Sequence, residues 1–154
     1  MRRAETNAIE RGDGVRVLVI DDEPDVLLLC KVNFEFAGYE VIGALDGERG
    51  MELAERERPD LIVLDVMLPN RDGISVLEEL GARSDTREVP VVLLTAKAQP
   101  EDQLRGWKAG ASEYVTKPFS PVALTEIVQR VMEMTPEERR RRREQALVDL
   151  TGRA

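Results

Sequence analysis

The stretch VRVLVIDDEPDVLLLCKVNFEFAG (residues 15–38) decides the fold of this chain. It opens with an apolar, β-branched run that ends at two adjacent aspartates, Asp21 and Asp22. After Pro24, apolar residues recur at helical spacing as far as Gly38. These residues are Val26, Leu29, Cys30, Phe34 and Ala37. The pattern predicts a buried strand followed by an amphipathic helix.

The same strand-then-helix pattern repeats along the chain. Further strands are expected over residues 39–44, 60–66, 89–96 and 112–117. Further helices are expected over residues 46–58, 73–83, 100–110 and 120–134. Such alternation predicts an α/β fold, in which a doubly wound five-stranded parallel sheet is flanked by five helices.

Composition narrows the class of protein. The chain has 154 residues, 42% of them hydrophobic, which is enough for one core, and its net charge is -8. This acidity argues against a surface that binds nucleic acid without regard to sequence. The only cysteine, Cys30, excludes an internal disulfide, and no run approaches the length of a membrane span. We expect a cytoplasmic protein with no membrane partner.

Chemistry-bearing residues lie where the predicted strands end. They are Asp21, Asp22, Asp65, Thr95 and Lys117. Ligands of doubly wound sheets bind at the carboxyl ends of the strands, so these side chains should meet in one pocket. Carboxylates that converge despite their repulsion indicate a hard divalent cation, and Mg²⁺ fits best because it keeps waters that a phosphate can displace.

This residue set suits phosphoryl transfer. Asp65 can attack a phosphoryl group as a nucleophile, while Lys117 and Thr95 supply a cation and a hydroxyl donor. A Gly-rich phosphate loop ending in Gly-Lys-Ser or Gly-Lys-Thr does not occur in the sequence.

Four segments, taken together, resemble the receiver domain of two-component response regulators, whose fold is CheY-like and flavodoxin-like. They are VIDDEPD (19–25), LIVLDVMLPNRDG (61–73), VVLLTA (91–96) and GASEYVTKPF (110–119). The resemblance covers about residues 15–134 and implies that Asp65 accepts the phosphoryl group. It also implies that Asp22, Asp65 and the Met67 backbone carbonyl bind Mg²⁺ directly, with Asp21 acting through water.

The resemblance also assigns roles around the phosphoryl group. Thr95 and Lys117 are expected to contact it, and the Lys117–Pro118 peptide is expected to be cis. Tyr114 matches the switch aromatic, which turns inward as the residue at Thr95 is drawn toward the phosphate. The chain would then be a signalling switch with self-catalysed phosphorylation and slow autodephosphorylation, not a turnover enzyme.

The chain contains no histidine, so a partner must donate the phosphoryl group. By resemblance this is a sensor histidine kinase or a histidine phosphotransfer protein, and the output is a downstream protein target. A phosphorylation-dependent dimer also fits this class of protein. We expect no sequence-specific binding of nucleic acid, since the chain has no room for a separate DNA-reading domain.

Other interpretations exist for the same residues. The aspartates after the first strand could cap the next helix, and Tyr114 could be a packed surface residue. A haloacid-dehalogenase-type phosphohydrolase also uses an aspartate nucleophile, but its second aspartate is replaced here by Met67. The chain could also be an adaptor that does not depend on phosphorylation, or the receiver fragment of a longer regulator with a missing output domain.

The sequence suggests three segments. Residues 1–14 form a polar leader expected to be flexible, residues 15–134 the receiver domain, and residues 135–154 a basic extension. In the extension, Thr135 and Glu138 predict a capping box and a separate short helix. Its arginine run, residues 139–143, is expected to form a solvated helix face, with an anionic partner or nucleic acid as the alternative.

Overall fold

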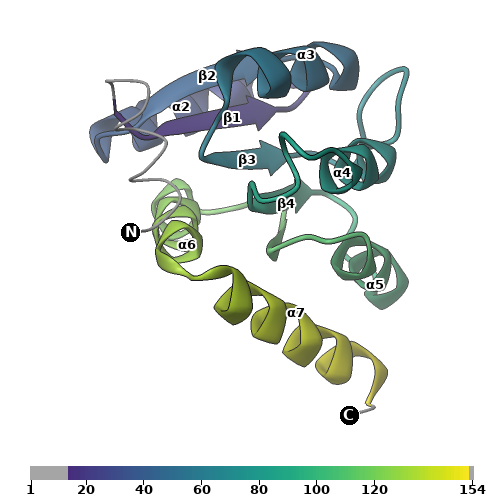
Figure 1. Ribbon diagram of the computed structural model, residues 1–154. Helices are drawn as coiled ribbons and strands as arrows, with labels where there is room; N and C mark the ends of the chain where they lie inside the picture. The colour runs from purple at the N-terminus through teal and green to yellow at the C-terminus, as the bar shows by residue number, and fades with distance from the viewer. Residues whose placement is uncertain (1–13, 153–154) are drawn as a thin grey trace.

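Figure 1 shows the computed structural model, which describes residues 14–152 and contains one parallel sheet between layers of helices. The strands are β1 (Arg16–Ile20), β2 (Glu40–Ala44), β3 (Leu61–Leu64), β4 (Val91–Thr95) and β5 (Glu113–Thr116). Their order in the sheet is β2-β1-β3-β4-β5. The leader expected at residues 1–14 lies outside the described residues except for Gly14.

Five helices flank the sheet and a sixth follows them within residues 14–152. They are α2 (Pro24–Phe36), α3 (Gly47–Glu57), α4 (Gly73–Ala82), α5 (Pro100–Lys108), α6 (Pro121–Glu133) and α7 (Pro136–Thr151). The predicted doubly wound α/β fold with a short C-terminal helix is therefore confirmed. No helix in this part of the chain combines the length and apolar character that crossing a bilayer requires.

Alternating side chains of the strands build two separate core layers. Leu18 and Ile20 of β1 pack in one cluster with apolar residues of α3 and α4. Val17 and Val19, which point to the opposite face, pack with residues of α2 and α6. Because both faces are covered, the strands are apolar throughout, which explains their unbroken hydrophobic runs.

Helix α2 follows its predicted apolar face only in part. Cys30 and Phe34 are buried in the core, and burial raises the pKa of the Cys30 thiol to about 12. Leu29, which we assigned to the same face, is 41% exposed. That assignment was wrong because α2 is apolar on most of its surface, so spacing alone does not identify the buried stripe.

The strand order places the reversal point of the sheet between β1 and β3. These two strands are hydrogen-bonded neighbours, although β2 separates them in sequence. Asp21 follows β1 directly and Asp65 follows β3 directly, and the Asp65 N–H donates to the Ile20 carbonyl at 3.0 Å. The two aspartates are therefore side by side at the carboxyl edge of the sheet.

Helix α7 packs against the domain through part of its arginine run. It begins at the predicted capping box, in which Thr135 and Glu138 bond reciprocally, and it lies alongside α5 (Figure 1). Arg139 is buried and donates to the Met134 carbonyl at 2.8 Å. The expectation of a fully solvated arginine face was therefore wrong, because positions three and four apart turn toward the domain.

Arg142 makes the clearest contact of this helix. Its guanidinium lies 5.0 Å from the ring centroid of buried Trp107 and 3.1 Å from the carboxylate of Glu113, which is 6% exposed. Arg130 of α6 also lies 3.7 Å from Glu113. One acidic residue at the start of β5 is thus shared between α6 and α7.

We predict that Arg142→Ala lowers the free energy of unfolding by about 1–2 kcal/mol, because it removes the cation–π contact and one partner of a buried carboxylate. Urea denaturation measures this change. Arg141→Ala is the matched control, since Arg141 is exposed and should change stability by less than about 0.5 kcal/mol. Equal losses in both variants would contradict docking through Arg142.

Candidate functional site

Three carboxylates converge at the carboxyl edge of the sheet. One oxygen of each of Asp21, Asp22 and Asp65 lies within 4.8 Å of the others. Asp21 is 1% exposed and Asp65 is 4% exposed, whereas Asp22 is open to solvent. Carboxylates this close repel one another, and burial weakens the screening of that repulsion by water.

Lys117 is the cation of this cluster. Its Nζ lies 2.8 Å from Asp21 Oδ2 and donates to Asp65 Oδ2 at 2.9 Å. Burial acts to lower the pKa of Lys117, but its bonds to these two carboxylates outweigh burial and raise that pKa. Lys117 follows β5, where its peptide with Pro118 is cis. The ammonium is therefore firmly charged and bridges the ends of β1 and β3.

One lysine does not satisfy the cluster. Asp21 Oδ2 is buried, and its partner is the Lys117 ammonium, which Asp65 shares. Burial raises the pKa of Asp21, and the nearby Asp65 carboxylate adds to that effect. Three converging carboxylates that face a single lysine, and that all offer oxygen ligands, fit a hard cation such as Mg²⁺.

The turn after Asp65 keeps Met67 beside the carboxylates. Asp65 Oδ1 accepts a hydrogen bond from the Met67 N–H at 2.9 Å, so the backbone folds over the aspartate. Farther along, the chain returns closely to β3: a Cβ on Gly73 would lie 2.2 Å from the Asp65 carbonyl oxygen. Only glycine fits at that position without displacing the strand end.

Asp21 and Asp22 do not cap α2 through their side chains. The N-cap of α2 is Glu23, which forms no side-chain capping bond. Asp21 Oδ1 accepts from the Glu23 N–H at 2.9 Å, and Glu23 Oε2 lies 3.6 Å from Lys117 Nζ. The capping interpretation of the aspartate pair is therefore unsupported. The contact of Glu23 with Lys117 is a further acidic contribution that the sequence analysis did not assign.

Thr95 and Tyr114 lie on neighbouring strands. Thr95 ends β4, is fully buried, and its hydroxyl oxygen accepts from the Lys97 N–H at 3.3 Å. The Tyr114 hydroxyl donates to the Lys97 carbonyl at 2.6 Å, and burial raises its pKa to about 12. Both side chains are thus attached to the backbone of the connection between β4 and α5.

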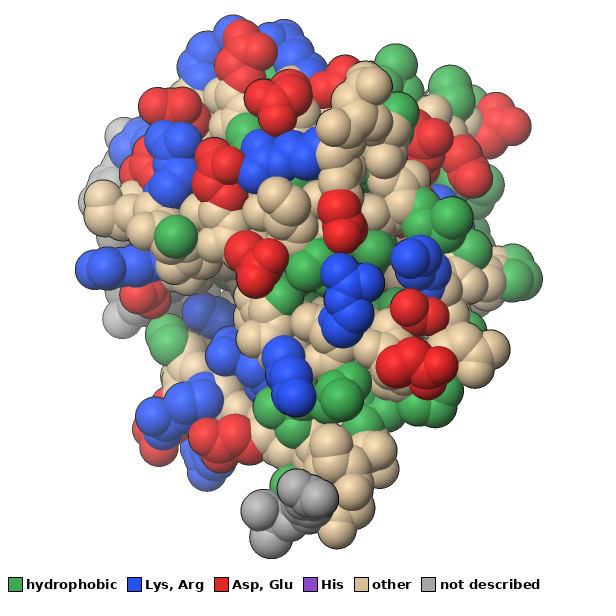
Figure 2. Space-filling view, turned by 90° about the vertical axis from the view of Figure 1, so that its right-hand side faces the viewer, with side chains coloured by type: hydrophobic (Ala, Val, Ile, Leu, Met, Phe, Trp, Pro, Cys, Tyr) green, Lys and Arg blue, Asp and Glu red, His purple; other side chains and the backbone are tan. Residues whose placement is uncertain are grey.

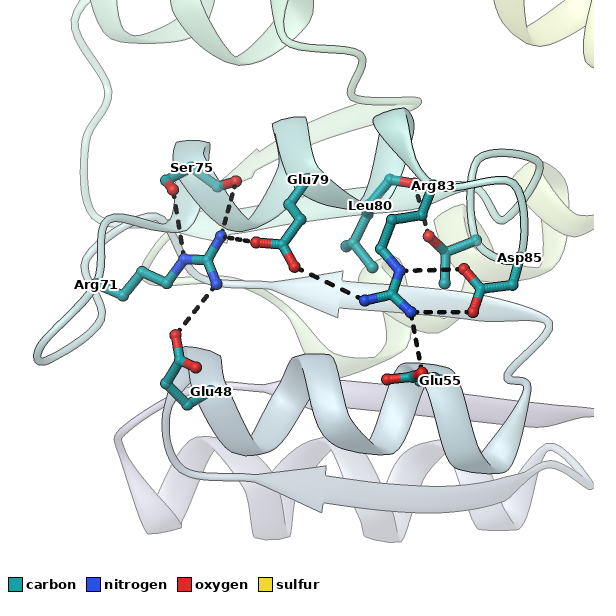
Figure 3. A network of polar contacts seen from close by, with 9 residues as sticks. Glu48, Glu55, Arg71, Ser75, Glu79, Leu80, Arg83 and Asp85 are labelled. Carbon is teal, nitrogen blue, oxygen red and sulfur yellow. Dashed lines mark hydrogen bonds and ion pairs between the residues drawn. The ribbon is translucent and has the colours of Figure 1, made fainter.

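Arg71 anchors the connection between β3 and α4, and the sequence analysis missed it (Figure 3). Its guanidinium bonds to Glu79 of α4 and, at 3.1 Å, to Glu48 of α3. It also donates to the Ser75 hydroxyl at 3.3 Å. Only an arginine with its several donors reaches all these partners. Nothing in the local sequence indicates the contact with Glu48, which lies 23 positions away.

Figure 2 views the side of the molecule toward which the β1 and β3 arrows of Figure 1 point. Acidic and basic side chains alternate over this face, with hydrophobic side chains between them. A shallow cavity here is lined by Asp22, Lys97 and residues 66–72. The exposed side of the carboxylate cluster is therefore open to a partner.

Comparison with known proteins relates the chain to one family. The profile of the family described as response regulator receiver domain matches residues 17–129. The chain is 49% identical over 106 residues to the alkaline phosphatase synthesis transcriptional regulatory protein PhoP of Bacillus subtilis. The aligned region covers 69% of this chain and 43% of that protein. It is 45% identical over 120 residues to the probable transcriptional regulatory protein TcrX of Mycobacterium tuberculosis, covering 78% and 48%. The chain thus spans about half the length of these relatives.

Two solved structures align with the chain over most of its length. The chemotaxis protein CheY4 of Vibrio cholerae aligns with a TM-score of 0.72 and 32% identity, covering 76% of this chain and 98% of that one. A putative response regulator from Chloroflexus aurantiacus aligns with a TM-score of 0.74 and 30% identity, covering 78% and 98%.

The raised pKa of Asp21 predicts how pH affects stability. The favourable contribution of its protonated form is complete below the ordinary value of 3.8 and is lost as pH rises through the raised pKa. Without divalent metal, Asp21→Asn should therefore gain stability relative to the native chain as pH increases above about 4. Urea unfolding in the presence of a chelator, from about pH 3 to about pH 7, measures this difference over the range in which carboxylates titrate.

Asp85→Asn provides a control of opposite sign. The hydrogen bond from Arg83 lowers the pKa of Asp85, so this variant should lose stability relative to the native chain as pH rises. If the Asp21→Asn difference followed the Asp85→Asn trend, the assigned direction for Asp21 would be wrong.

Arg71 should support metal binding without touching the metal. Arg71→Ala is expected to weaken Mg²⁺ binding by about tenfold, since it frees the connection that holds Met67. Isothermal calorimetry measures this affinity. Arg49→Ala is the control, because Arg49 pairs with Glu52 along α3 at 3.1 Å and does not reach that connection. An unchanged affinity in Arg71→Ala would contradict this role.

Proposed function

The chain belongs to the family of response regulator receiver domains, and we propose that it is a phosphoacceptor switch whose acceptor is Asp65. The observation that carries the proposal is the convergence of three carboxylates on one lysine, with Lys117 bridging Asp21 and Asp65. This arrangement needs more positive charge than the described residues supply. It is suited to bind a cation and then a phosphoryl group.

Asp21, Asp22, Asp65 and the backbone carbonyl of Met67 would hold Mg²⁺. When bound, the ion offsets negative charge on the transferring phosphoryl oxygens. The carboxylates fix its place at the strand ends, and the bond from the Met67 N–H orients Asp65. Asp22, the most exposed of the three acids, borders the open cavity from which the ion and the phosphoryl group would enter.

In the transfer step, a carboxylate oxygen of Asp65 attacks the phosphorus of a partner's phosphohistidine. A phosphorus–oxygen bond forms, the phosphorus–nitrogen bond breaks, and the imidazole leaves with its electron pair. Lys117 then moves its hydrogen bond from Asp65 to the new phosphoryl oxygens, where its charge is most useful. The chain has no histidine, so the donor is another protein, either a sensor histidine kinase or a histidine phosphotransfer protein.

Thr95 and Tyr114 would transmit the change. The Thr95 hydroxyl is bonded only weakly to the Lys97 N–H, at 3.3 Å, so a phosphoryl oxygen can compete for it. Any shift of this connection reaches Tyr114, whose hydroxyl bonds the Lys97 carbonyl. The altered surface over α5 and β5 would bind a downstream protein or a second copy of the chain.

The proposal concerns protein contacts. The similar proteins carry names of transcriptional regulators, but this chain spans about half of each of them. We propose that residues 15–134 form the receiver unit, that 135–154 extend it, and that neither binds a specific DNA sequence. The phosphohydrolase alternative is not favoured, because Met67 stands where such an enzyme needs its second aspartate.

We predict that Mg²⁺ and acetyl phosphate add one phosphoryl group to the native chain, and that Asp65→Asn abolishes the addition because it removes the nucleophile. Intact-mass spectrometry detects the added group. Lys117→Ala should keep Mg²⁺ binding but lose the surface change that follows phosphorylation. Asp149→Asn is the control, since Asp149 is exposed on α7, bonds only Gln145 there and should label normally. Full labelling of Asp65→Asn would exclude Asp65 as the acceptor.

A further inference from the structure

A second cavity lies at the opposite edge of the sheet from Asp65. It has a volume of about 540 Å³ and is bordered by the end of α4, the start of β4, the end of α5 and one residue of α7. That residue is Arg143, which lies beyond the part of the chain matched by the family profile. The volume is within the range of small-molecule pockets. The C-terminal helix therefore supplies part of the wall of this cavity.

Three cations border this cavity without acidic partners. Arg87, Lys108 and Arg143 line it, and among the residues the structure describes none of them lies within ion-pair distance of a carboxylate. Most other arginines of residues 14–152 form an ion pair with a carboxylate, including the adjacent Arg142 with Glu113. One acid, Glu78, also lines the cavity. The formal charge at the cavity is positive although the chain as a whole is acidic.

The Arg143 guanidinium lacks an acidic partner among the described residues at this cavity. Its Nε is buried and makes no hydrogen bond. Because that nitrogen is out of reach of solvent, a ligand in the cavity would meet the terminal nitrogens of the guanidinium instead. Guanidinium groups match carboxylate, sulfonate and phosphate oxygens in geometry as well as charge. An anion is therefore the ligand that suits this guanidinium.

The floor of the cavity is apolar. Leu77, Leu80, Val89 and Val91 line it, and all four are buried members of the core cluster beneath α4. The one buried hydroxyl there, of Thr86, is already bonded to the Leu80 carbonyl at 2.7 Å. The wall is therefore mixed, with a small apolar floor from these core residues and polar and charged groups around it.

We propose that this cavity binds a small organic anion, an apolar body carrying a carboxylate, sulfonate or phosphate group. The anionic group meets Arg143 and Lys108, and the apolar body lies against the leucine and valine floor. Because Arg143 belongs to α7 and Lys108 to α5, the ligand joins the two helices. This inference does not depend on the chemistry at Asp65.

Anilinonaphthalene sulfonate is a suitable probe, since it combines a sulfonate with an aromatic body and fluoresces when bound. We expect saturable binding of one molecule per native chain. The double variant Arg143→Gln with Lys108→Gln should raise the dissociation constant at least about tenfold, because it removes both charges that meet the sulfonate. Arg141→Gln removes one charge from the exposed side of the same helix and should change the constant less than about twofold.

Two further arms locate the probe. Gly81 lines the cavity and a Cβ there would meet no atom within 4 Å, so Gly81→Leu should fill the space and abolish binding without unfolding α4. Phenylnaphthylamine, the same body without the sulfonate, should bind at least about tenfold more weakly than the sulfonate. Absence of saturable binding, unchanged binding to Gly81→Leu, or an equal loss in Arg141→Gln would overturn the proposal.

Discussion

The repulsion among the carboxylates at the ends of β1 and β3 is the constraint on which the site depends. The strand order brings Asp21 and Asp65 together, and burial denies them the water that would screen their charges. Lys117 offsets part of this charge through two short contacts. It does not offset all of it, because three carboxylates face this single ammonium. The pocket is thus prepared for an additional cation.

The rest of the fold holds these charges in place. A sheet covered on both faces cannot relax its strand ends without disturbing two cores at once. The connection after β3 is more open, and Arg71 fixes it by joining α3 and α4 (Figure 3). Gly73 lets that connection return against Asp65. Rigid strand ends and an anchored connection keep the oxygen ligands converged despite their repulsion.

Helix α7 shows how one basic run serves two surfaces. Arg139 and Arg142 turn inward and bond to a carbonyl and a carboxylate, whereas Arg140 and Arg141 face solvent. Arg143 lies between these cases, half-buried at a cavity with no acidic partner. The helix contacts α5 and the start of β5, next to Tyr114. A change at the cavity beside Arg143 therefore has a short physical path to Tyr114, and a change at Tyr114 has the same path back to the cavity.

Sequence by itself determined the fold class and the convergence of Asp21, Asp65 and Lys117, since parallel strands of a doubly wound sheet end at one edge. The capping box also predicted that residues 139–143 lie in a helix. It could not tell which face is covered, because that depends on where α5 lies. The contact of Arg71 with Glu48 likewise depends on packing, because Glu48 belongs to α3, 23 positions earlier in the chain. Local periodicity fixes the direction of a side chain, but only tertiary packing decides what it meets.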